Sequence, residues 1–408
     1  MEYDMVFEGG GAKGMAFIGC LEELEALGHR PARLLGASAG AIIATLLAAG
    51  YDSDEMGRSL SETQEDGQPV FLGFLEIPPK LTNEAIKNSA IRELLRSANM
   101  KLVPDFLEER LDDEIADLLA NSPITGRLCS FIEFGGIFAA EGFLVWLVGK
   151  LNSGIYPLER GNFGKDKLRA FGNMNLAEYY EATGAELSLV ASDTSDSRML
   201  VLNHNTAPDC PIKWAVRMSM SFPLLWHEVV WQSSWGSYMG NAITGHTVVD
   251  GGLLSNFPIE LFLSNQERVT KVMGETNNAN TAILGFLIDE TLTVPAGSVL
   301  EKGPGRFNFG GFKTVQRVMN LINTMTQAHD KMAIEAYKAF VIRLPAKGYG
   351  TVEFDMSDER RDALIEAGRI ATRSYFNQMA AQSLAMQDFA VPPSFETADR
   401  IATRILYS

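Results

Sequence analysis

Cysteine and histidine are both scarce in this sequence. Its three cysteines, Cys20, Cys129 and Cys210, are far apart and odd in number. They form neither a disulfide framework nor a set with metal-ligand spacing, so we expect buried or half-buried free thiols. The five histidines in 408 residues leave few candidates for the base that a nucleophilic serine usually requires. No metal site or cofactor is expected from these residues.

Positive charge is also in short supply. Lysine and arginine number 35 against 51 aspartates and glutamates, which gives a net charge of −16. This balance argues against nucleic-acid binding, which favours a basic face. A net negative charge also does not attract the protein as a whole to anionic lipid, although a local basic patch remains compatible with this composition.

The sequence has no long apolar run that would direct it to a membrane. Residues 1–4 are Met-Glu-Tyr-Asp, without the basic and apolar regions of a secretory signal. We therefore expect a cytoplasmic protein, although an effector exported by a dedicated machine would have the same appearance. The most apolar stretch, residues 131–151, contains Glu133, Glu141 and several glycines, which argue against a membrane-spanning helix. It fits a buried helix pair or, alternatively, a lid whose Phe143 and Trp146 cover a binding site or touch a bilayer.

The order of apolar segments predicts an α/β protein with a mostly parallel sheet. A strand at residues 3–7 is followed by a helix at 15–27, a strand at 32–35 and an Ala-rich buried helix that reaches residue 49. Further strands are predicted at 187–191, 199–202, 227–231, 246–249, 281–288 and 340–344. Further helices are predicted at 211–218, at 313–339 and from 357 onward, and an exposed loop is predicted at 233–245.

The turn after the second predicted strand has the pattern G-x-S-x-G. It comprises Gly36, Ser38 and Gly40, between an apolar strand and an apolar helix. This pattern is typical of a nucleophile elbow, in which a serine hydroxyl is lifted out of the sheet at a tight bend. The N–H groups that open the following helix favour negative charge near Ser38. The pattern alone is not specific, because turns of small residues are common.

A glycine-rich loop follows the first predicted strand. Gly9, Gly10 and Gly11 expose backbone N–H groups without Cβ obstruction, as an oxyanion hole requires. Together with Gly14 they also match the G-x-G-x-x-G pattern of dinucleotide sites. That alternative requires an acidic residue at the end of the second strand, where this chain has Ser38. The oxyanion role is therefore favoured.

Asp250 also lies at the end of a predicted strand, before Gly251 and Gly252, so its carboxylate can be approached closely. No histidine has a convincing catalytic setting, and each fits a structural role better. They are His29 and His204 in turns, His227 and His246 on strands and His329 inside a helix.

Together, these three motifs resemble those of the patatin-like phospholipase family. The phrases Ser221-Phe222-Pro223 and Leu253-Leu254-Ser255-Asn256-Phe257-Pro258 support the resemblance. It spans most of the chain, from the first strand to about residue 376. It implies a three-layer α/β/α fold with a helical lid region. The implied domains are a catalytic domain at 1–345, with a lid or insert at 75–151, and a helical extension at 346–408 packed on the same domain.

The resemblance also implies chemistry through a Ser–Asp dyad without histidine. Carried over, Ser38 is the nucleophile, Asp250 is the base and Gly9, Gly10 and Gly11 form the oxyanion hole. The motif glycines that support them are Gly14, Gly36, Gly40, Gly251 and Gly252. Lys13 could support the oxyanion, orient the loop or meet a phosphate head group, or be a solvated surface residue. Asn256 and Pro258 are expected to build a turn.

The expected activity is a serine lipid acyl hydrolase of the phospholipase A or lysophospholipase type. Its partner would be a phospholipid or other acyl lipid, met in transient contact with a membrane surface. A lipid-binding protein with weak catalysis and an acyltransferase on the same fold are the alternatives. The sequence leaves head group, acyl position, activator and oligomeric state open.

Overall fold

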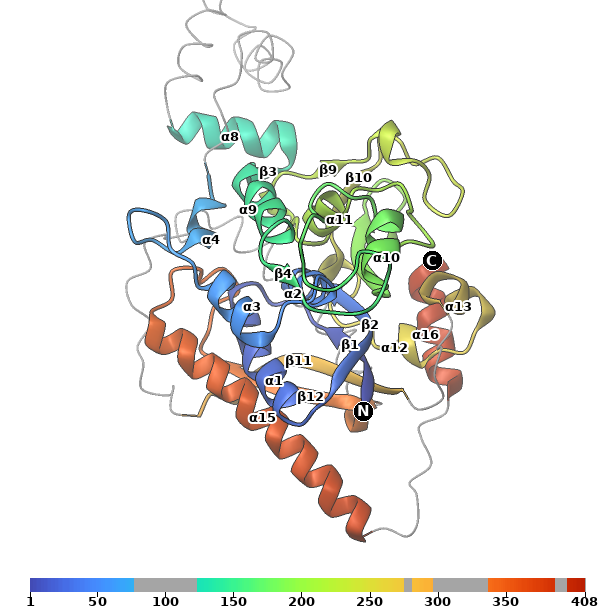
Figure 1. The fold of residues 1–408 in the computed structure, drawn as a ribbon. Helices are drawn as coiled ribbons and strands as arrows, with labels where there is room; N and C mark the ends of the chain where they lie inside the picture. Colours follow the sequence, from blue (N-terminus) through green and yellow to red (C-terminus); the bar gives the residue numbers. More distant parts are fainter. Residues whose placement is uncertain (77–122, 275–280, 296–336, 386–394, 408) are drawn as a thin grey trace, which may run out of the picture.

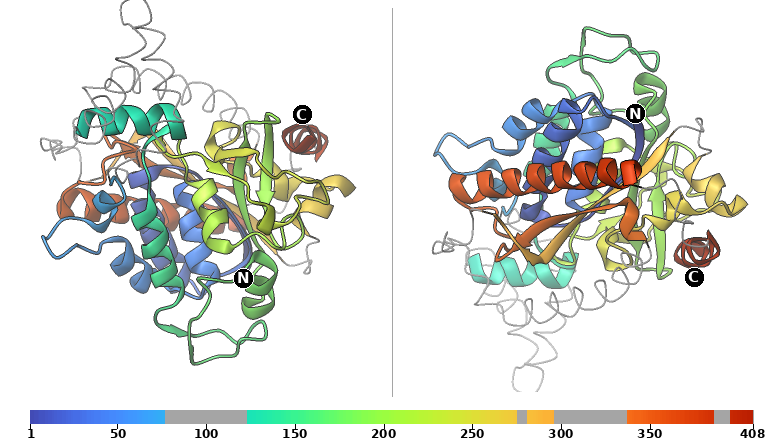
Figure 2. Two further views of the ribbon diagram at one scale, coloured as in Figure 1. Left: turned by 90° about the horizontal axis from the view of Figure 1, so that it is seen from above. Right: turned by 90° about the horizontal axis from the view of Figure 1, so that it is seen from below.

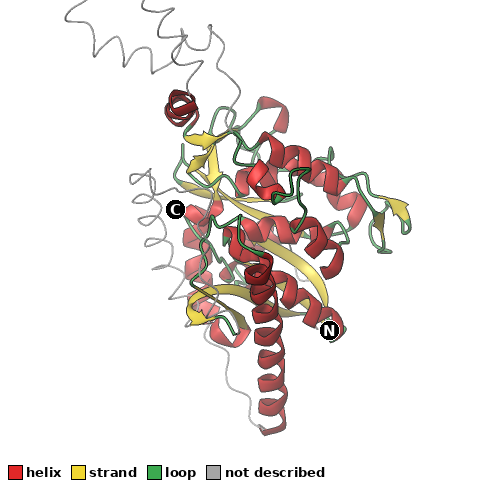
Figure 3. Ribbon diagram, turned by 90° about the vertical axis from the view of Figure 1, so that its left-hand side faces the viewer, coloured by secondary structure: helices red, strands yellow, loops and turns green. Residues whose placement is uncertain are grey.

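A mixed β-sheet runs through the middle of the molecule (Figures 1 and 3). The computed structural model describes residues 1–76, 123–274, 281–295, 337–385 and 395–407. Within these ranges the sheet has eight strands in the order β12-β11-β1-β2-β6-β10-β9, and β7 pairs with β6 off this path. Their bounds are β1 Glu2–Phe7, β2 Arg30–Ala37, β6 Leu187–Asp193, β7 Arg198–Leu202, β9 Val229–Val230, β10 Thr247–Asp250, β11 Ala282–Thr293 and β12 Val341–Lys347.

The middle of the sheet is parallel, and one side of it is antiparallel. The strands from β12 through β11, β1 and β2 to β6 all pair in parallel, whereas β7, β10 and β9 join by antiparallel pairing. Two short ladders lie outside this sheet. They consist of β3 Gly136–Phe138 with β8 Leu224–Trp226, and β4 Ile155–Tyr156 with β5 Lys167–Leu168.

Helices cover both faces of the sheet, as expected for a three-layer α/β/α fold (Figure 2). The larger core packs beneath α1, α2, α9, α10, α11 and α15, and the smaller core beneath α12, α13 and α16. Consecutive strand residues alternate between the two, because successive side chains of a strand point to opposite faces. Met5 and Leu34 belong to the larger core, whereas Val6 and Leu35 belong to the smaller one.

The predicted helices at 15–27, up to residue 49, at 211–218 and from 357 onward are present, whereas the helices at 176–183, 260–263 and 267–273 were not predicted. Their bounds are α1 Ala16–Ala26, α2 Ala39–Ala48, α3 Ser53–Leu60, α4 Val70–Gly73, α8 Pro123–Phe134, α9 Glu141–Leu151, α10 Leu176–Thr183, α11 Ile212–Ser219, α12 Glu260–Leu263, α13 Glu267–Met273, α15 Asp358–Ala385 and α16 Phe395–Tyr407. None of the described helices is both long and apolar enough to cross a membrane. Residues 77–122 of the predicted insert and 313–336 of the predicted helix lie outside the described residues.

Two sequence expectations were wrong in detail. Of the predicted strand at 227–231, only Val229–Val230 forms a strand, β9, and His227 lies between β8 and β9. The segment 233–245 is anchored rather than simply exposed, because it buries three apolar side chains, those of Trp235, Tyr238 and Ile243. Trp235 packs edge-on against Trp231. An apolar residue within a Gly- and Ser-rich segment can therefore fix it to the core.

The apolar segment 131–151 consists of the end of α8, then β3 and α9. Phe143 is fully buried and Trp146 is 8% exposed, and both belong to the larger core. Their burial fits the core interpretation and leaves neither ring available to touch a bilayer. Val145, on the same helix, is 75% exposed.

The long helix α15 lies alongside α1 and β12 (Figures 1 and 2). Two glycines allow the helices to approach closely. A Cβ on Gly19 would lie 1.8 Å from the carbonyl oxygen of Ile365, and one on Gly368 would lie 2.0 Å from that of Ala16. Both obstacles are backbone atoms, which cannot move aside without shifting a helix.

The substitution Gly368→Ala should therefore destabilise the fold. We expect a loss of about 1–3 kcal/mol in the free energy of unfolding, as for overpacked cores, measured by urea titration. The matched control is Gly149→Ala in α9, where a Cβ meets nothing within 4 Å. It should leave stability unchanged or raise it slightly, because alanine favours the helix. Equal stability of the two variants would contradict the close helix contact.

Candidate active site

Ser38 lies on the sharp bend between β2 and α2. Its backbone has φ 51° and ψ −122°, a conformation that costs energy for a residue with a Cβ and that clusters at functional sites. The flanking glycines make the bend possible. A Cβ on Gly36 would lie 2.4 Å from the carbonyl oxygen of Gly40, and one on Gly40 would lie 2.2 Å from that of Phe7. The turn therefore has the geometry that the G-x-S-x-G pattern predicts.

The strand register brings Asp250 to Ser38. Strand β7 occupies one edge of β6 along residues 189–193, so β2 and β10 share the other edge, end to end. Val190 of β6 pairs with Ala37, and the next residue, Ala191, pairs with Asp250. The residue after Ala37 is Ser38. The parallel β2 and the antiparallel β10 therefore end against each other at the level of Ala191.

Asp250 is a buried carboxyl group with incomplete hydrogen bonding. It is 1% exposed, its Oδ1 accepts from the Gly252 N–H at 2.8 Å, and its Oδ2 has no hydrogen-bond partner among the described residues. Burial raises the pKa of Asp250 to about 7, against the lowering effects of the Ser38 side chain and the Gly252 N–H. Because burial penalises the charged form, this carboxyl can accept a proton near neutral pH.

The glycine loop packs directly against Ser38. A Cβ on Gly9 would lie 2.9 Å from Ser38 Cβ, and one on Gly14 would lie 3.2 Å from Ala39 Cβ. The Gly9 N–H donates to the Asn256 carbonyl oxygen at 3.2 Å, so it is not available as an oxyanion donor. The N–H groups of Gly10 and Gly11 have no acceptor among the described residues. These two groups are the ones free to bind a ligand oxygen.

Lys13 is not a solvated surface residue. It is 5% exposed and its ammonium group forms an ion pair with Glu290, on β11. Its backbone N–H donates to the Gly10 carbonyl oxygen at 3.3 Å. The side chain therefore anchors the glycine loop to the neighbouring strand. The surface interpretation was wrong because the partner lies 277 residues away in the sequence.

The four described histidines contact other parts of the protein. The partners are the rings of Tyr3 and Phe376 for His29, the Tyr180 ring for His204, the Ser130 hydroxyl for His227 and the Asp193 carboxylate for His246. Burial lowers the pKa of His227 to about 4, which keeps that ring neutral. His329 lies outside the described residues.

One group of described residues has ligand types that a metal could use. Asp193, Asp196 and His246 offer ligand atoms within 4.8 Å of one another. Arg198 already pairs with both carboxylates, at 3.2 Å and 3.3 Å. Arg198 thus compensates the negative charge of the two carboxylates without a metal ion, so we assign no metal to this group.

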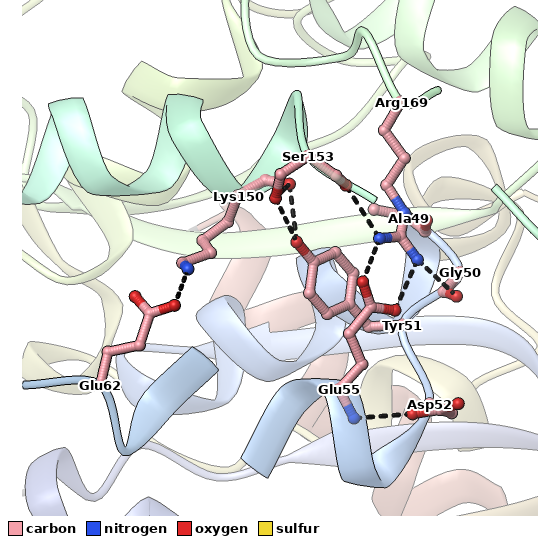
Figure 4. A network of polar contacts seen from close by, with 9 residues as sticks. All are labelled: Ala49, Gly50, Tyr51, Asp52, Glu55, Glu62, Lys150, Ser153 and Arg169. Atoms are coloured by element: carbon pink, nitrogen blue, oxygen red, sulfur yellow. Dashed lines mark hydrogen bonds and ion pairs between the residues drawn. The ribbon is translucent and has the colours of Figure 1, made fainter. Parts of the chain in front are cut away.

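The far end of α2 is held by a buried arginine (Figure 4). Arg169 donates to the carbonyl oxygens of Ala49 at 2.9 Å and Gly50 at 3.0 Å, just after the helix ends. It also forms an ion pair with Glu55 of α3 and lies over the Tyr51 ring. The helix that begins at Ser38 is thus fixed at its C-terminal end by charge-assisted hydrogen bonds.

A cavity of about 480 Å³ opens beside the bend. Its wall includes Gly11 and Ala39, which adjoin the glycine loop and Ser38. Apolar side chains make up much of the remainder: Ile42, Ile43, Leu60, Phe71, Phe354 and Met356. Residues 353–359 and 361, just before and at the start of α15, supply one side. Its size lies within the range of about 300–1,000 Å³ found for small-molecule sites.

Sequence reasoning missed two serines that hold the site. The Ser38 N–H donates to Ser219 Oγ at 3.2 Å, and the Asp250 N–H donates to the Ser221 carbonyl oxygen at 3.0 Å. The end of α11 and the residues just after it therefore fix both Ser38 and Asp250. Ser221-Phe222-Pro223 was noted as a motif, but its contact with Asp250 depends on sheet pairing.

Sequence reasoning also took Asn256 for a residue that builds a turn. Its side chain instead contacts the glycine loop, through hydrogen bonds to Glu8 and Gly9. No sequence signal identified this contact, because it joins residues about 247 positions apart.

Comparison with known proteins finds a curated relative and several solved structures. A curated relative, the uncharacterized protein YqhO of Bacillus subtilis (strain 168), is 28% identical over 385 residues, which cover 93% of this chain and 99% of the relative. Among solved structures, VipD from Legionella pneumophila is 18% identical with a TM-score of 0.42, covering 92% of this chain and 67% of that one. The complex ExoU–SpcU from the type III secretion system of Pseudomonas aeruginosa is 15% identical with a TM-score of 0.37, covering 98% and 58%.

The family comparison covers the segment that contains all three motifs. The model of the patatin-like phospholipases matches residues 5–263, from β1 through the end of α12. This is more than half of the 408-residue chain. The match includes the glycine loop, the bend at Ser38 and the strand that ends at Asp250. The chain therefore belongs to the patatin-like phospholipase family.

Proposed function

We propose that the protein is a serine hydrolase of lipid acyl esters, with Ser38 as nucleophile and Asp250 as general base. The observation that carries the proposal is the shared ending of β2 and β10 on one edge of β6, which sets Ser38 beside a buried carboxyl group. A pKa of about 7 suits that carboxyl to proton transfer at neutral pH. The N–H groups of Gly10 and Gly11, which meet no acceptor in the described part of the chain, lie on the adjoining loop.

In the first half of the reaction, Ser38 Oγ attacks the ester carbonyl carbon and Asp250 accepts the hydroxyl proton. The carbonyl oxygen becomes an oxyanion, which the N–H groups of Gly10 and Gly11 stabilise together with the N-terminal end of α2. Collapse of this intermediate breaks the ester bond. The departing alcohol takes the proton from Asp250, and the acyl group remains on Ser38.

In the second half, water replaces the alcohol. Asp250 accepts a proton from the water as its oxygen attacks the acyl-enzyme carbonyl carbon. The tetrahedral intermediate again places its oxyanion against Gly10 and Gly11. Ser38 leaves with the proton held by Asp250, and a fatty acid is released.

The cavity beside the bend supports a substrate with a long acyl chain. Its apolar side chains would remove the chain from water, which contributes about 0.8 kcal/mol for each buried CH₂ group. Residues 353–359 and 361 line this cavity. We therefore propose that the region after residue 345 completes the catalytic domain. Phospholipids and lysophospholipids, met at a membrane surface, are the substrate class.

Two alternatives use the same fold. A lipid-binding protein without turnover is less favoured, because Ser38, the raised pKa of Asp250 and the free N–H groups of the glycine loop would then have no use. Acyl transfer to an acceptor other than water uses the same residues. Analysis of the products separates hydrolysis from transfer.

The dyad is tested by a fluorophosphonate probe, which labels an activated serine. We expect labelling of the wild-type protein, none of Ser38→Ala, and a rate lowered by about 10²–10⁴-fold in Asp250→Asn, because the general base is lost. The control Ser233→Ala alters an exposed serine and should behave as wild type. Mass spectrometry of a phospholipid mixture should show fatty acid release only where Ser38 is intact. Labelling of Ser38→Ala at the wild-type rate would refute the assignment.

The pH dependence follows from the pKa of Asp250. The base must be ionised, so kcat/KM for a soluble ester should fall by about tenfold per pH unit below pH 7 and be constant above it. The check is a profile from pH 5 to 9 on a substrate that does not ionise there. A profile already flat at pH 5 would contradict the assignment of Asp250 as the base.

Ionisation of Asp250 should also destabilise the fold as the pH rises from about 4 to above 7. Because its pKa rises from 3.8 to about 7 on folding, its favourable contribution is complete below pH 3.8 and is lost as the pH rises through about 7. The side chain in Asp250→Asn cannot ionise. The free energy of unfolding of this variant, relative to that of the wild type, should therefore rise by on the order of 1–4 kcal/mol from pH 4 to pH 8. Thermal unfolding at both pH values measures this, and a difference independent of pH would exclude a buried titrating carboxyl.

The cavity is tested by filling it. Ser61 lines its wall, and Ser61→Trp should lower kcat/KM for long-chain esters by about tenfold or more, because lost pocket contacts are worth about 1–3 kcal/mol. Acetyl esters should be hydrolysed as by wild type, and Ser61→Ala is the control of small size. An equal loss on long and short esters would mean that the acyl chain binds elsewhere.

A further inference from the structure

The peptide between Gly9 and Gly10 is held from one side by a single side chain. Asn256 Nδ2 donates to the Gly9 carbonyl oxygen at 2.6 Å. The backbone carbonyl oxygen of Asn256 also accepts from the Gly9 N–H, in the preceding peptide unit, at 3.2 Å. Its Oδ1 lies where a Cβ of Gly9 would stand, 2.1 Å from that position. The contact is therefore specific for asparagine on one side and glycine on the other.

Glu8 sets the orientation of this amide. Its Oε1 accepts from Asn256 Nδ2 at 3.1 Å, and its Oε2 accepts from the Ile288 N–H. The carboxylate is 8% exposed, so it holds its partners in a poorly hydrated setting where such bonds are strong. One hydrogen of the Asn256 amide is taken by Glu8 and the other by Gly9.

Planarity of the peptide transmits this contact to the next residue. The carbonyl of Gly9 and the N–H of Gly10 are the two ends of one trans peptide unit and point in opposite directions. Fixing the carbonyl oxygen against Asn256 therefore fixes the direction of the Gly10 N–H. A hydrogen bond to the carbonyl also polarises the unit and strengthens the N–H as a donor.

We propose that Asn256, oriented by Glu8, is a positioning residue that aims and strengthens the Gly10 N–H as an oxyanion donor. This inference rests on the proposed function of Ser38 and Asp250. Asn256 follows Asp250 by six residues, so one turn supplies both the base and the support of the oxyanion donor. The two halves of the site are thus joined by the Asn256–Gly9 contact.

The test compares Asn256→Ala and the isosteric Asn256→Asp with wild type on a soluble long-chain p-nitrophenyl ester. The Asn256→Asp substitution removes the Nδ2 donor and sets a second carboxylate against Glu8. We expect kcat to fall by about 10–100-fold with little change in KM, because a displaced oxyanion donor weakens only transition-state binding. The control Asn241→Ala removes an exposed loop side chain that contacts the Met239 carbonyl oxygen and should retain wild-type kcat.

A second measurement separates positioning from a general structural role. An acyl trifluoromethyl ketone forms a tetrahedral adduct with serine, whereas the free fatty acid binds without one. In both Asn256 variants the affinity for the ketone should fall by the same factor as kcat/KM, and the affinity for the fatty acid should be unchanged. If Asn256→Ala does not fold, the affinities for the ketone and for the fatty acid can still be compared in Asn256→Asp.

Wild-type kcat in the variants, or a loss confined to KM or equal for ketone and fatty acid, would overturn the inference while leaving the dyad intact. A wild-type protein without Ser38-dependent turnover would overturn the proposed function, and this inference with it.

Discussion

The site depends on the close approach of α2 to the end of β1. Gly40, in the first turn of α2, lies so near the Phe7 carbonyl that a Cβ would be 2.2 Å from its oxygen. This approach allows the chain to turn at Ser38 within one residue and puts the glycine loop after β1 against the bend. A larger residue at position 36 or 40 would push the helix away from the sheet. The strain at Ser38 is held by the packing of α2, which is almost entirely buried.

The buried carboxyl group of Asp250 lowers the stability of the fold when it is ionised. Asp250 is 1% exposed, and one of its carboxyl oxygens has no hydrogen-bond partner among the described residues, so its ionised form is costly. The same burial raises its pKa to about 7 and makes it a far better proton acceptor at neutral pH than an exposed aspartate. The proposed base is thus also a group that destabilises the folded protein when it is ionised.

The sequence predicted the parts of the site that are local. The bend around Ser38, the loop at residues 9–11 and the strand end at Asp250 each follow from short patterns of glycine and apolar residues. What it could not predict depends on partners far along the chain. Lys13 was misjudged because Glu290 is 277 residues away. The contact of Asn256 with the glycine loop joins residues 247 positions apart and could not be predicted either. The burial of Trp235 in a polar loop likewise depends on tertiary contacts with Trp231.

The central claim is that Ser38 becomes acylated during turnover. Rapid-quench mixing with excess long-chain ester, followed by peptide mass spectrometry, tests it most directly. Acylation of Ser38 should give a transient mass increase of one acyl group on the peptide that contains this residue, formed before steady-state product release. Turnover without an adduct on this peptide, or an adduct on another residue, would contradict it.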